Sequence, residues 1–318
     1  MDTPRSEPSC EQPGARGLEI VSLVGMVRSG STYLEGRLAD LYGGVAVGEV
    51  IGAWGALRRG DRLCACMKPA LECPFWQAVM DRYPQLCDRE IGDFMIQTNR
   101  STMPIRNYRK WNSIINDESG CALNRYQHEI SRLYRAIAET SSEFGFSLVV
   151  DSSKHPLFYH LTRTSGAFQA FANSHALRLV RDPRGVAKSL ETPKEYASVS
   201  GVKRMKSSTA LRSIPYWLAM NITSDRVVDD NTPYLRYEDL PKERYRKLMS
   251  DLGHNVVSLS VSSNRHQLIA NPVRQQGRTT FKLDKRWLSM PPTKRLLVSA
   301  VLFPWMRRYG YQTPFARK

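Results

Sequence analysis

Residues 18–34 combine a largely apolar run with a loop rich in glycine and hydroxyl side chains, a pattern suited to binding phosphate or sulfate. Residues 18–24 are apolar enough for an inner strand of a parallel sheet, and Ser29, Ser31 and Thr32 are residue types that often begin a helix. The first turn of a helix offers unpaired N–H groups and the positive end of the helix dipole, and both attract anions. The sequence therefore predicts an anion cradle built from a strand, a loop and a helix start.

The spacing from Gly25 to Gly30-Ser31-Thr32 is that of a Walker A loop, except that Ser31 occupies the lysine position. The Walker lysine contacts the β- and γ-phosphates of a triphosphate, so its absence argues against a nucleoside triphosphatase. Arg28 is three residues upstream and offers a replacement charge. An ordinary strand–turn–helix, in which the glycine only makes the bend, is the alternative interpretation of this stretch.

A second anion-binding pair is indicated after the apolar run 175–180. Arg181 stands at the end of this predicted strand, and Pro183 is well placed to begin the following helix. Ser189 is eight residues after Arg181, on the second turn of that helix. Both side chains can then approach one phosphate, because an arginine can bind two phosphate oxygens at once.

Charged side chains follow two further predicted strands. Glu49 follows strand 45–47, and Lys154 and His155 follow strand 146–150. Because ligands of open parallel sheets bind at the carboxyl ends of the strands, these side chains are candidates for chemistry. Asp151 occupies a Walker B position, but without a Walker lysine we expect it to be a structural residue that caps the next helix.

The expected fold is α/β, with a central parallel sheet flanked by helices. Residues 18–318 are expected to form one domain, and residues 1–17 a disordered tail. Residues 50–125 interrupt the alternation of strand and helix and are expected to be a helical insertion on the acceptor side of the site. Further elements are expected at residues 33–42, 124–144 and 210–228 (helices) and 232–236 (strand).

The net charge of +16 indicates anionic partners without identifying them. No stretch has the run of about 18 apolar residues that a membrane span requires, and the polar amino terminus has no secretory signal. We therefore expect a cytoplasmic protein. Cys64, Cys66, Cys73 and Cys87 lack the paired spacing of a zinc knuckle, so reduced structural thiols and no metal are expected.

Together, the two anion-binding motifs resemble those of sulfotransferases that use 3′-phosphoadenosine 5′-phosphosulfate (PAPS). In that family an Arg/Lys-Ser-Gly-Thr/Ser-Thr/Ser loop holds the 5′-phosphosulfate, and an Arg and a Ser eight residues apart hold the 3′-phosphate. Arg28-Ser-Gly-Ser-Thr32 and Arg181…Ser189 match both motifs in order. The resemblance implies a three-layer P-loop sulfotransferase-like fold, PAPS as donor, no metal, and donor contacts from Arg28, Ser29, Gly30, Ser31, Thr32, Arg181 and Ser189.

Finer details resemble the tyrosylprotein and carbohydrate branches of that family. The tyrosylprotein enzymes have a catalytic glutamate 21 residues after the loop arginine, and Glu49 stands 21 residues after Arg28. Ser153-Lys-His-Pro156 resembles their Asn-Lys-Asp-Pro segment, which implies a catalytic role for Lys154. By comparison with the cytosolic branch, His155 is the alternative base. We expect Glu49 to be the catalytic base and rank His155 second for this role.

Two later segments have weaker matches. Tyr237-Glu-Asp-Leu240 resembles a common segment of the family, and Arg274 and Arg278 resemble a basic loop that closes over the nucleotide. Tyr237 and Arg274 are therefore further candidate donor contacts. Residues 293–309 are expected to form one closing helix, with Leu296, Leu297, Val301 and Trp305 inward; its basic residues also suit a membrane surface.

The resemblance implies transfer of a sulfuryl group to an acceptor hydroxyl or amine. Small-molecule, carbohydrate, lipid and peptide acceptors all stay open, as does the oligomeric state. Two alternative functions stay open: the chain is a kinase-like P-loop phosphotransferase, or it is a non-catalytic protein that binds polyanions. The chain has no recognisable nucleic-acid motif, so nucleic acid is not an expected partner.

Overall fold

The computed structural model describes residues 17–116, 123–205, 207–256, 264–268 and 281–312. Its centre is a five-stranded parallel sheet in the order β2-β3-β1-β4-β7. The strands are β1 (Glu19–Gly25), β2 (Gly44–Gly48), β3 (Leu148–Lys154), β4 (Asn173–Val180) and β7 (Tyr234–Arg236). The predicted α/β class and central parallel sheet are confirmed.

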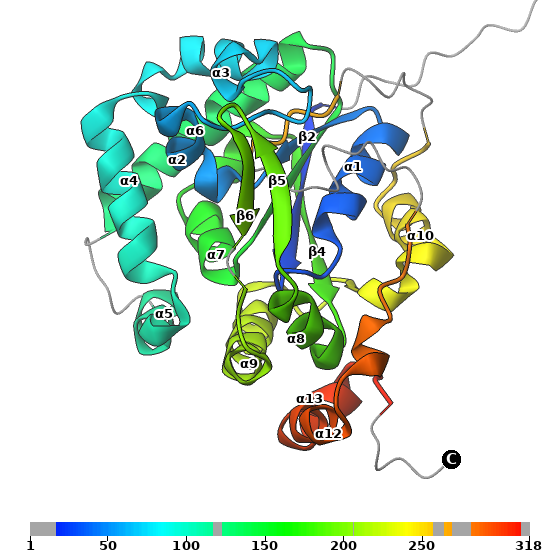
Figure 1. Cartoon of the computed structure of the whole chain (residues 1–318). Coiled ribbons are helices and arrows are strands. Elements are labelled where there is room, and N and C mark those ends of the chain that lie inside the picture. The colour runs from blue at the N-terminus through cyan, green and yellow to red at the C-terminus, as the bar shows by residue number, and fades with distance from the viewer. Residues whose placement is uncertain (1–16, 117–122, 206, 257–263, 269–280, 313–318) are drawn as a thin grey trace, which may run out of the picture.

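Helices cover both faces of this sheet, which makes three layers (Figure 1). Along β1, Ile20 packs into one apolar cluster, whereas Val21 and Leu23 pack into the other, as the alternation of side chains along a strand requires. The second cluster includes α1 (Ser31–Leu41) and α10 (Arg244–Asp251). The first includes α6 (Asn124–Glu143), α7 (Pro156–Thr164), α8 (Pro183–Glu191) and α9 (Ala210–Val227).

The described part of the segment between β2 and α6 is mostly helical, apart from a loop at residues 60–69. It contains α2 (Ala53–Arg59), α3 (Pro74–Arg82), α4 (Arg89–Thr102) and α5 (Tyr108–Ile115). Trp54, Trp76 and Trp111 are buried in the same cluster as the sheet residues, so this segment packs on the core of the domain. The described residues also form short 3-10 helices: η1 (Val50–Gly52), η2 (Ala70–Glu72), η3 (Pro84–Leu86), η4 (Ile105–Asn107), η6 (Ala167–Ala170), η7 (Tyr237–Lys242) and η8 (Arg286–Ser289).

A hairpin that we did not predict follows α8. Its strands β5 (Lys194–Ser198) and β6 (Gly201–Met205) are antiparallel, and in Figure 1 it stands in front of the sheet. The hairpin contacts the loop after α2: Val199 N in its turn donates to Asp61 O (3.1 Å), and Lys203 in β6 forms an ion pair with Asp61. The hairpin therefore connects α8 with the helical segment across the front of the sheet.

The carboxyl-terminal helix differs from the prediction. It is divided into α12 (Pro292–Val301) and α13 (Phe303–Arg308), because Pro304 has no N–H to continue the helix from α12. Leu296, Leu297 and Val301 are exposed rather than inward, by 48%, 43% and 47%, and Trp305 is half-buried. The buried side chains are instead Val298, Leu302 and Met306.

No helix in the described part of the chain is both long and apolar enough to cross a membrane. Contact of the exposed apolar face with a membrane surface stays a prediction. The proposed disordered tail lies outside the described residues, apart from Gly17.

Candidate functional site

The loop between β1 and α1 has the tight geometry of an anion cradle. Gly25 lies so close to β4 that a Cβ there would be 2.2 Å from Leu179 O. Arg28 (φ 68°) and Gly30 (φ 86°) both have left-handed backbone conformations, which turn the chain back on itself. Gly30 is the N-cap of α1, so the amino terminus of that helix faces the carboxyl edge of the sheet. Ser29, which is fully buried, donates to Met26 O (2.5 Å) and fixes the turn.

Arg181 lies against this loop, at the end of β4. Its Nη1 donates to Arg28 O (2.7 Å), and its Nη2 is 3.2 Å from Asp284 Oδ2. Its guanidinium lies 3.9 Å from the centre of the Tyr237 ring, and a Cβ at Gly30 would be 2.9 Å from the same ring. The structure thus brings Arg181 and Tyr237 together with the loop. Arg181 Nε is buried and has no hydrogen-bond partner among the described residues.

Two further predicted donor contacts are Ser189, which the structure describes, and Arg274, which lies outside the described residues. Ser189 is on the second turn of α8 and is 1% exposed. Gly185, one turn earlier, packs on Arg181: a Cβ there would be 3.0 Å from Arg181 Nε. The helix that carries Ser189 is therefore in contact with Arg181. Arg274 and Arg278 lie outside the described residues.

Glu49 and Lys154 form a close ion pair at the same edge of the sheet. Lys154 Nζ donates to Glu49 Oε1 (2.6 Å) and to Ser152 O (2.7 Å). Lys154 is 5% exposed, whereas 29% of the Glu49 side chain is accessible to solvent. Lys154 has a left-handed backbone (φ 65°) at the end of β3. A buried cation thus holds a carboxylate that is partly accessible to solvent.

Glu35, which the sequence analysis missed, positions both of these residues. It is fully buried on α1, where Oε1 accepts from Gly48 N (2.5 Å) and Oε2 accepts from Ser152 Oγ (2.8 Å). Gly48 precedes Glu49, and the Ser152 carbonyl accepts from Lys154. The available signal was a charged residue directly after Leu34, in the first turns of the predicted helix.

We expect Glu35→Ala to lower the free energy of unfolding by about 2–4 kcal/mol, because two buried donors lose their acceptor. Glu35→Gln should restore much of this stability, since its amide oxygen can still accept from Gly48. Urea unfolding measures both variants. If Glu35→Ala unfolds at the same urea concentration as the wild type, Glu35 does not hold the two strand ends together.

His155 lies next to Lys154 but its imidazole is turned toward the helical segment. Its Nε2 is 3.0 Å from Met103 O, and its ring contacts the Trp111 ring edge-on at 4.8 Å. Burial lowers the pKa of His155 to about 4. The imidazole is therefore neutral at physiological pH, and a bond to the Met103 carbonyl requires its proton on Nε2.

Asp151 is a structural residue, as expected, but it does not cap the next helix. It lies inside β3, and the N-cap of α7 is His155. Its carboxylate accepts from Tyr134 OH (2.5 Å), Ser153 Oγ (2.6 Å) and Ser153 N (2.8 Å). Burial raises the pKa of Asp151. Because its oxygens are engaged in the core, Asp151 is poorly placed to bind magnesium.

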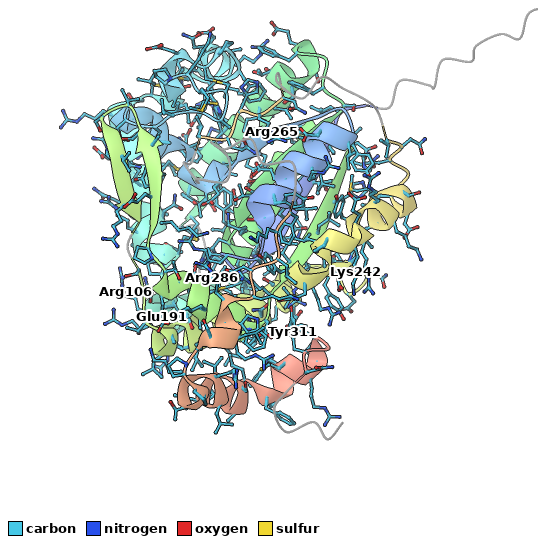
Figure 2. All side chains as sticks on the ribbon, turned by 45° about the vertical axis from the view of Figure 1, so that its right-hand side comes forward. Arg106, Glu191, Lys242, Arg265, Arg286 and Tyr311 are labelled. Atoms are coloured by element: carbon cyan, nitrogen blue, oxygen red, sulfur yellow. The ribbon has the colours of Figure 1, made fainter. Side chains whose placement is uncertain are left out.

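Two cations that the sequence analysis did not single out, Lys194 and Arg286, lie near Arg28 and Arg181. Lys194, the first residue of β5, has a pKa lowered to about 8 by burial and by the charges of Arg28 and Arg181. Arg286 forms a bidentate ion pair with Asp284 (2.8 Å for both contacts), and Figure 2 shows it at the end of the sheet opposite Arg265. The hairpin thus adds the cation of Lys194 to those of Arg28 and Arg181.

Tyr216 of α9 completes the surroundings of Glu49. Burial and the nearby charge of Glu49 raise the pKa of Tyr216 to about 12. Burial and the charge of Arg181 lower the pKa of Arg28, partly offset by Glu49. Cations therefore predominate at this edge of the sheet, and a site of this kind favours a ligand with several negative charges.

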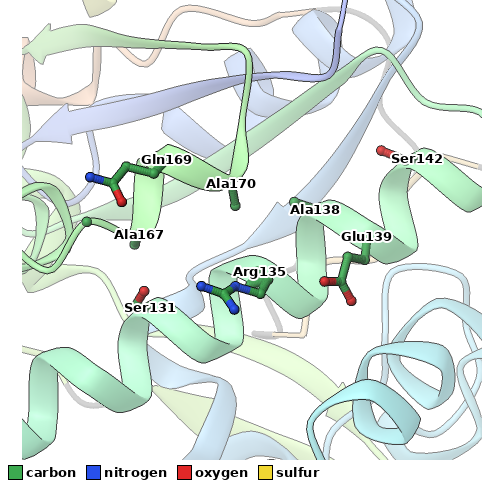
Figure 3. Close-up of a pocket in the computed structure, with 9 residues that line it drawn as sticks. Ser131, Arg135, Ala138, Glu139, Ser142, Ala167, Gln169 and Ala170 are labelled. Atoms are coloured by element: carbon green, nitrogen blue, oxygen red, sulfur yellow. The ribbon is translucent and has the colours of Figure 1, made fainter.

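A hollow of about 650 Å³ elsewhere on the molecule is separate from this site (Figure 3). It lies between α6 and η6 and is lined by small and polar side chains, including Arg135, Glu139 and Gln169. η6 is close to the amino end of β4, where Ala172 N donates to Leu18 O (2.8 Å). The hollow is thus at the opposite edge of the sheet from the anion cradle.

No protein-family model matches the chain, and no curated protein sequence matches it. Among solved structures, it is similar to the sulfotransferase domain of the olefin synthase from Synechococcus PCC 7002. The TM-score is 0.50 at 16% sequence identity, with 95% of this chain and 98% of that domain covered. This similarity shows that the chain has a sulfotransferase fold.

Two other sulfotransferases are more distant. The sulfotransferase domain from the curacin biosynthetic pathway has a TM-score of 0.44 at 15% identity, with 94% of this chain and 100% of that domain covered. A sulfotransferase from Mycobacterium avium has a TM-score of 0.44 at 10% identity, with 95% of this chain and 79% of that protein covered.

Proposed function

We propose that this protein transfers a sulfuryl group from PAPS to an acceptor hydroxyl or amine. The observation that carries the proposal is the meeting of two groups at one sheet edge: the Glu49–Lys154 pair, and Arg181 bonded to the loop at Arg28. The first group has a carboxylate able to take a proton, and the second is an anion site. The sulfotransferase fold supports this assignment.

The residues at the anion cradle are suited to the charged groups of PAPS. Backbone N–H groups of residues 29–32 and the positive end of α1 are suited to the 5′-phosphosulfate. Arg181, held by Tyr237 and Asp284, is suited to the 3′-phosphate together with Ser189. When bound, PAPS supplies the sulfuryl group and leaves as the 3′,5′-bisphosphate.

Each catalytic residue has one task in this proposal. Glu49 accepts the proton of the acceptor, provided that the hydroxyl comes within hydrogen-bond distance. Lys154 and Arg28 stabilise the negative charge that develops on the sulfuryl oxygens and on the leaving phosphate oxygen. Catalysis then depends on alignment and charge stabilisation, as in phosphoryl transfer.

The surroundings of the two candidate bases favour Glu49. Its carboxylate is paired with Lys154 and is partly accessible, whereas His155 bonds to Met103 O and packs on Trp111. A base must reach the acceptor, so the partly accessible carboxylate of Glu49 is better placed.

The kinase-like alternative has less support because the Asp151 carboxylate is engaged by Tyr134 and Ser153. A test that separates the two functions is the conversion of PAPS to 3′,5′-bisphosphoadenosine, followed by chromatography with a panel of alcohols, phenols, sugars and amines. We expect an acceptor-dependent conversion without added Mg²⁺. Turnover of Mg-ATP, with none of PAPS, would favour the kinase-like function.

The charge of Lys194 predicts how donor affinity changes with pH. A phosphate prefers the protonated lysine, and the pKa of Lys194 is about 8 because it is buried among cations. The affinity for 3′,5′-bisphosphoadenosine should therefore fall as the pH rises from 7 to 9. In Lys194→Met the affinity should be lower at pH 7 and nearly constant over this range. Calorimetric titration measures both; equal pH dependence in the two proteins would contradict a donor contact by Lys194.

A further inference from the structure

A second group of reactive side chains lies outside the transfer site. Cys64, Cys66, Cys73 and His266 each contribute one ligand atom, and these four atoms all lie within 4.8 Å of one another. The three cysteines belong to the segment from α2 to α3, and His266 belongs to the segment 264–268, which pairs with β2 at Ala46. The sequence spacing alone did not indicate this group, because His266 is 193 residues from Cys73.

The cluster is enclosed by protein. Cys64 and Cys73 are fully buried, His266 is 6% exposed, and Cys66 is half-buried. Cys73 Sγ is 3.2 Å from His266 Nδ1. Around a tetrahedral zinc ion with Zn–S bonds of about 2.3 Å, neighbouring ligand atoms are about 3.5–3.8 Å apart. The four atoms are thus close to the separations that one ion requires.

The backbone around the cysteines is arranged to turn them inward. Cys64 N donates to Lys68 O, and Met67 N donates to Cys64 O (both 2.9 Å). Met67 has a left-handed backbone (φ 68°), which is uncommon for a residue with a side chain and closes a tight turn. This turn brings Cys66 toward Cys64. Cys73 is the N-cap of α3, so the start of that helix fixes its backbone.

His266 is held in one orientation by three contacts. Its backbone N–H donates to Ala46 O (2.9 Å), and its backbone carbonyl accepts from Trp76 Nε1 (2.5 Å). Its imidazole stacks on the Phe75 ring, with 5.0 Å between ring centres and 12° between ring planes. These contacts direct Nδ1 toward the thiols before any ion binds, which lowers the entropy that binding must overcome.

We propose that Cys64, Cys66, Cys73 and His266 bind a structural zinc ion. Three sulfurs and one imidazole nitrogen form a Cys₃His set, which zinc prefers in four-coordinate sites. Four protein ligands leave no open position, so the ion has no role as a Lewis acid. A disulfide is a less satisfactory explanation of the cluster, because a bond between two of the sulfurs leaves the third thiol and the histidine without a function.

Such an ion would support the transfer site from a distance. It would join the segment 264–268 to the loop that contains Cys64 and Cys66, where Ala65 N already donates to Gln267 O (3.1 Å). Gln267 lies against the end of β2, since a Cβ at Gly48 would be 3.0 Å from Gln267 Cα. Glu49 is the next residue. The zinc ion would therefore stabilise the strand end that carries the candidate base.

Metal analysis of the purified full-length chain tests the proposal directly. Elemental analysis by mass spectrometry should find about one zinc ion per chain, because a buried thiolate site retains zinc during purification. The variant Cys66→Ser removes the least buried ligand of the four and should hold much less zinc. Cys87→Ser is the matched control: Cys87 is exposed, contacts Met80 Sδ (3.1 Å) and lies outside the cluster, so its zinc content should equal that of the wild type.

A second measurement does not depend on the folding of a variant. Wild-type chain produced with Co²⁺ should show the thiolate-to-cobalt absorption and the strong visible bands of a tetrahedral ion. Zinc and cobalt contents well below one per chain in the wild type, even after reconstitution, would overturn the proposal. So would a wild-type zinc content in Cys66→Ser, or a mass two hydrogens lower that maps to a disulfide within the cluster.

Discussion

Glu49→Gln is expected to lower the turnover number about 10²–10⁴-fold, the range over which a positioned general base accelerates proton transfer. Glutamine keeps the size of the side chain and can still accept a hydrogen bond from Lys154 Nζ, which is 2.6 Å from Glu49 Oε1. It cannot take the acceptor proton. Steady-state kinetics with an acceptor found in the panel measures this effect, and the affinity for 3′,5′-bisphosphoadenosine should change little.

His155→Gln is the matched control for this prediction. The amide can replace the contact of His155 Nε2 with Met103 O, so the local structure should be retained. If Glu49 is the base, His155→Gln should keep most of the wild-type turnover and the same dependence on pH. Nearly full turnover in Glu49→Gln, with a large decrease in His155→Gln, would exchange the two roles.

Arg181→Ala is expected to weaken binding of 3′,5′-bisphosphoadenosine about 10²–10⁴-fold, because two charge-assisted hydrogen bonds contribute about 1.5–3 kcal/mol each. Binding of 5′-AMP, which lacks the 3′-phosphate, should change far less. The prediction follows from the position of Arg181 against the loop at Arg28. Calorimetric titration of both nucleotides measures the difference.

Arg181 also has structural contacts, so its variants need a control for folding. Its carbonyl accepts from Trp217 Nε1 (2.9 Å), and its side chain contacts Asp284. Arg181→Lys keeps the charge but not the planar fork, and it should bind the bisphosphate with intermediate affinity. If Arg181→Ala is folded and binds the bisphosphate as the wild type does, the assignment of the 3′-phosphate site is wrong.

The parts of the fold that the sequence predicted are those encoded locally. The apolar run of β1, the glycines that follow it and the hydroxyl residues of α1 are adjacent in the chain, so their arrangement follows from neighbouring residues. The same holds for Arg181 and Ser189, which are joined by one short helix. Glu49 and Lys154 could be placed at one edge because parallel strands align their carboxyl ends.

The parts that the sequence analysis missed depend on contacts between distant segments. Lys194 joins the site only because the hairpin crosses the sheet and binds Asp61. His266 reaches the cysteines through the pairing of its segment with Ala46. Neither contact has a local pattern that identifies it. The buried face predicted for the carboxyl-terminal helix was wrong, because Val298, Leu302 and Met306 are buried in place of Leu296, Leu297 and Val301.

Thermal unfolding of the purified chain with 3′,5′-bisphosphoadenosine, 5′-AMP or Mg-ATP tests the central claim most directly. A ligand that binds the folded state at 100 times its Kd adds about 2.7 kcal/mol of stability, which raises the Tm of a chain of this size by about 4 °C. We predict this shift with the bisphosphate, without added Mg²⁺, and little or none with 5′-AMP. No shift with the bisphosphate, or a larger one with Mg-ATP, would contradict the assignment of this site to PAPS.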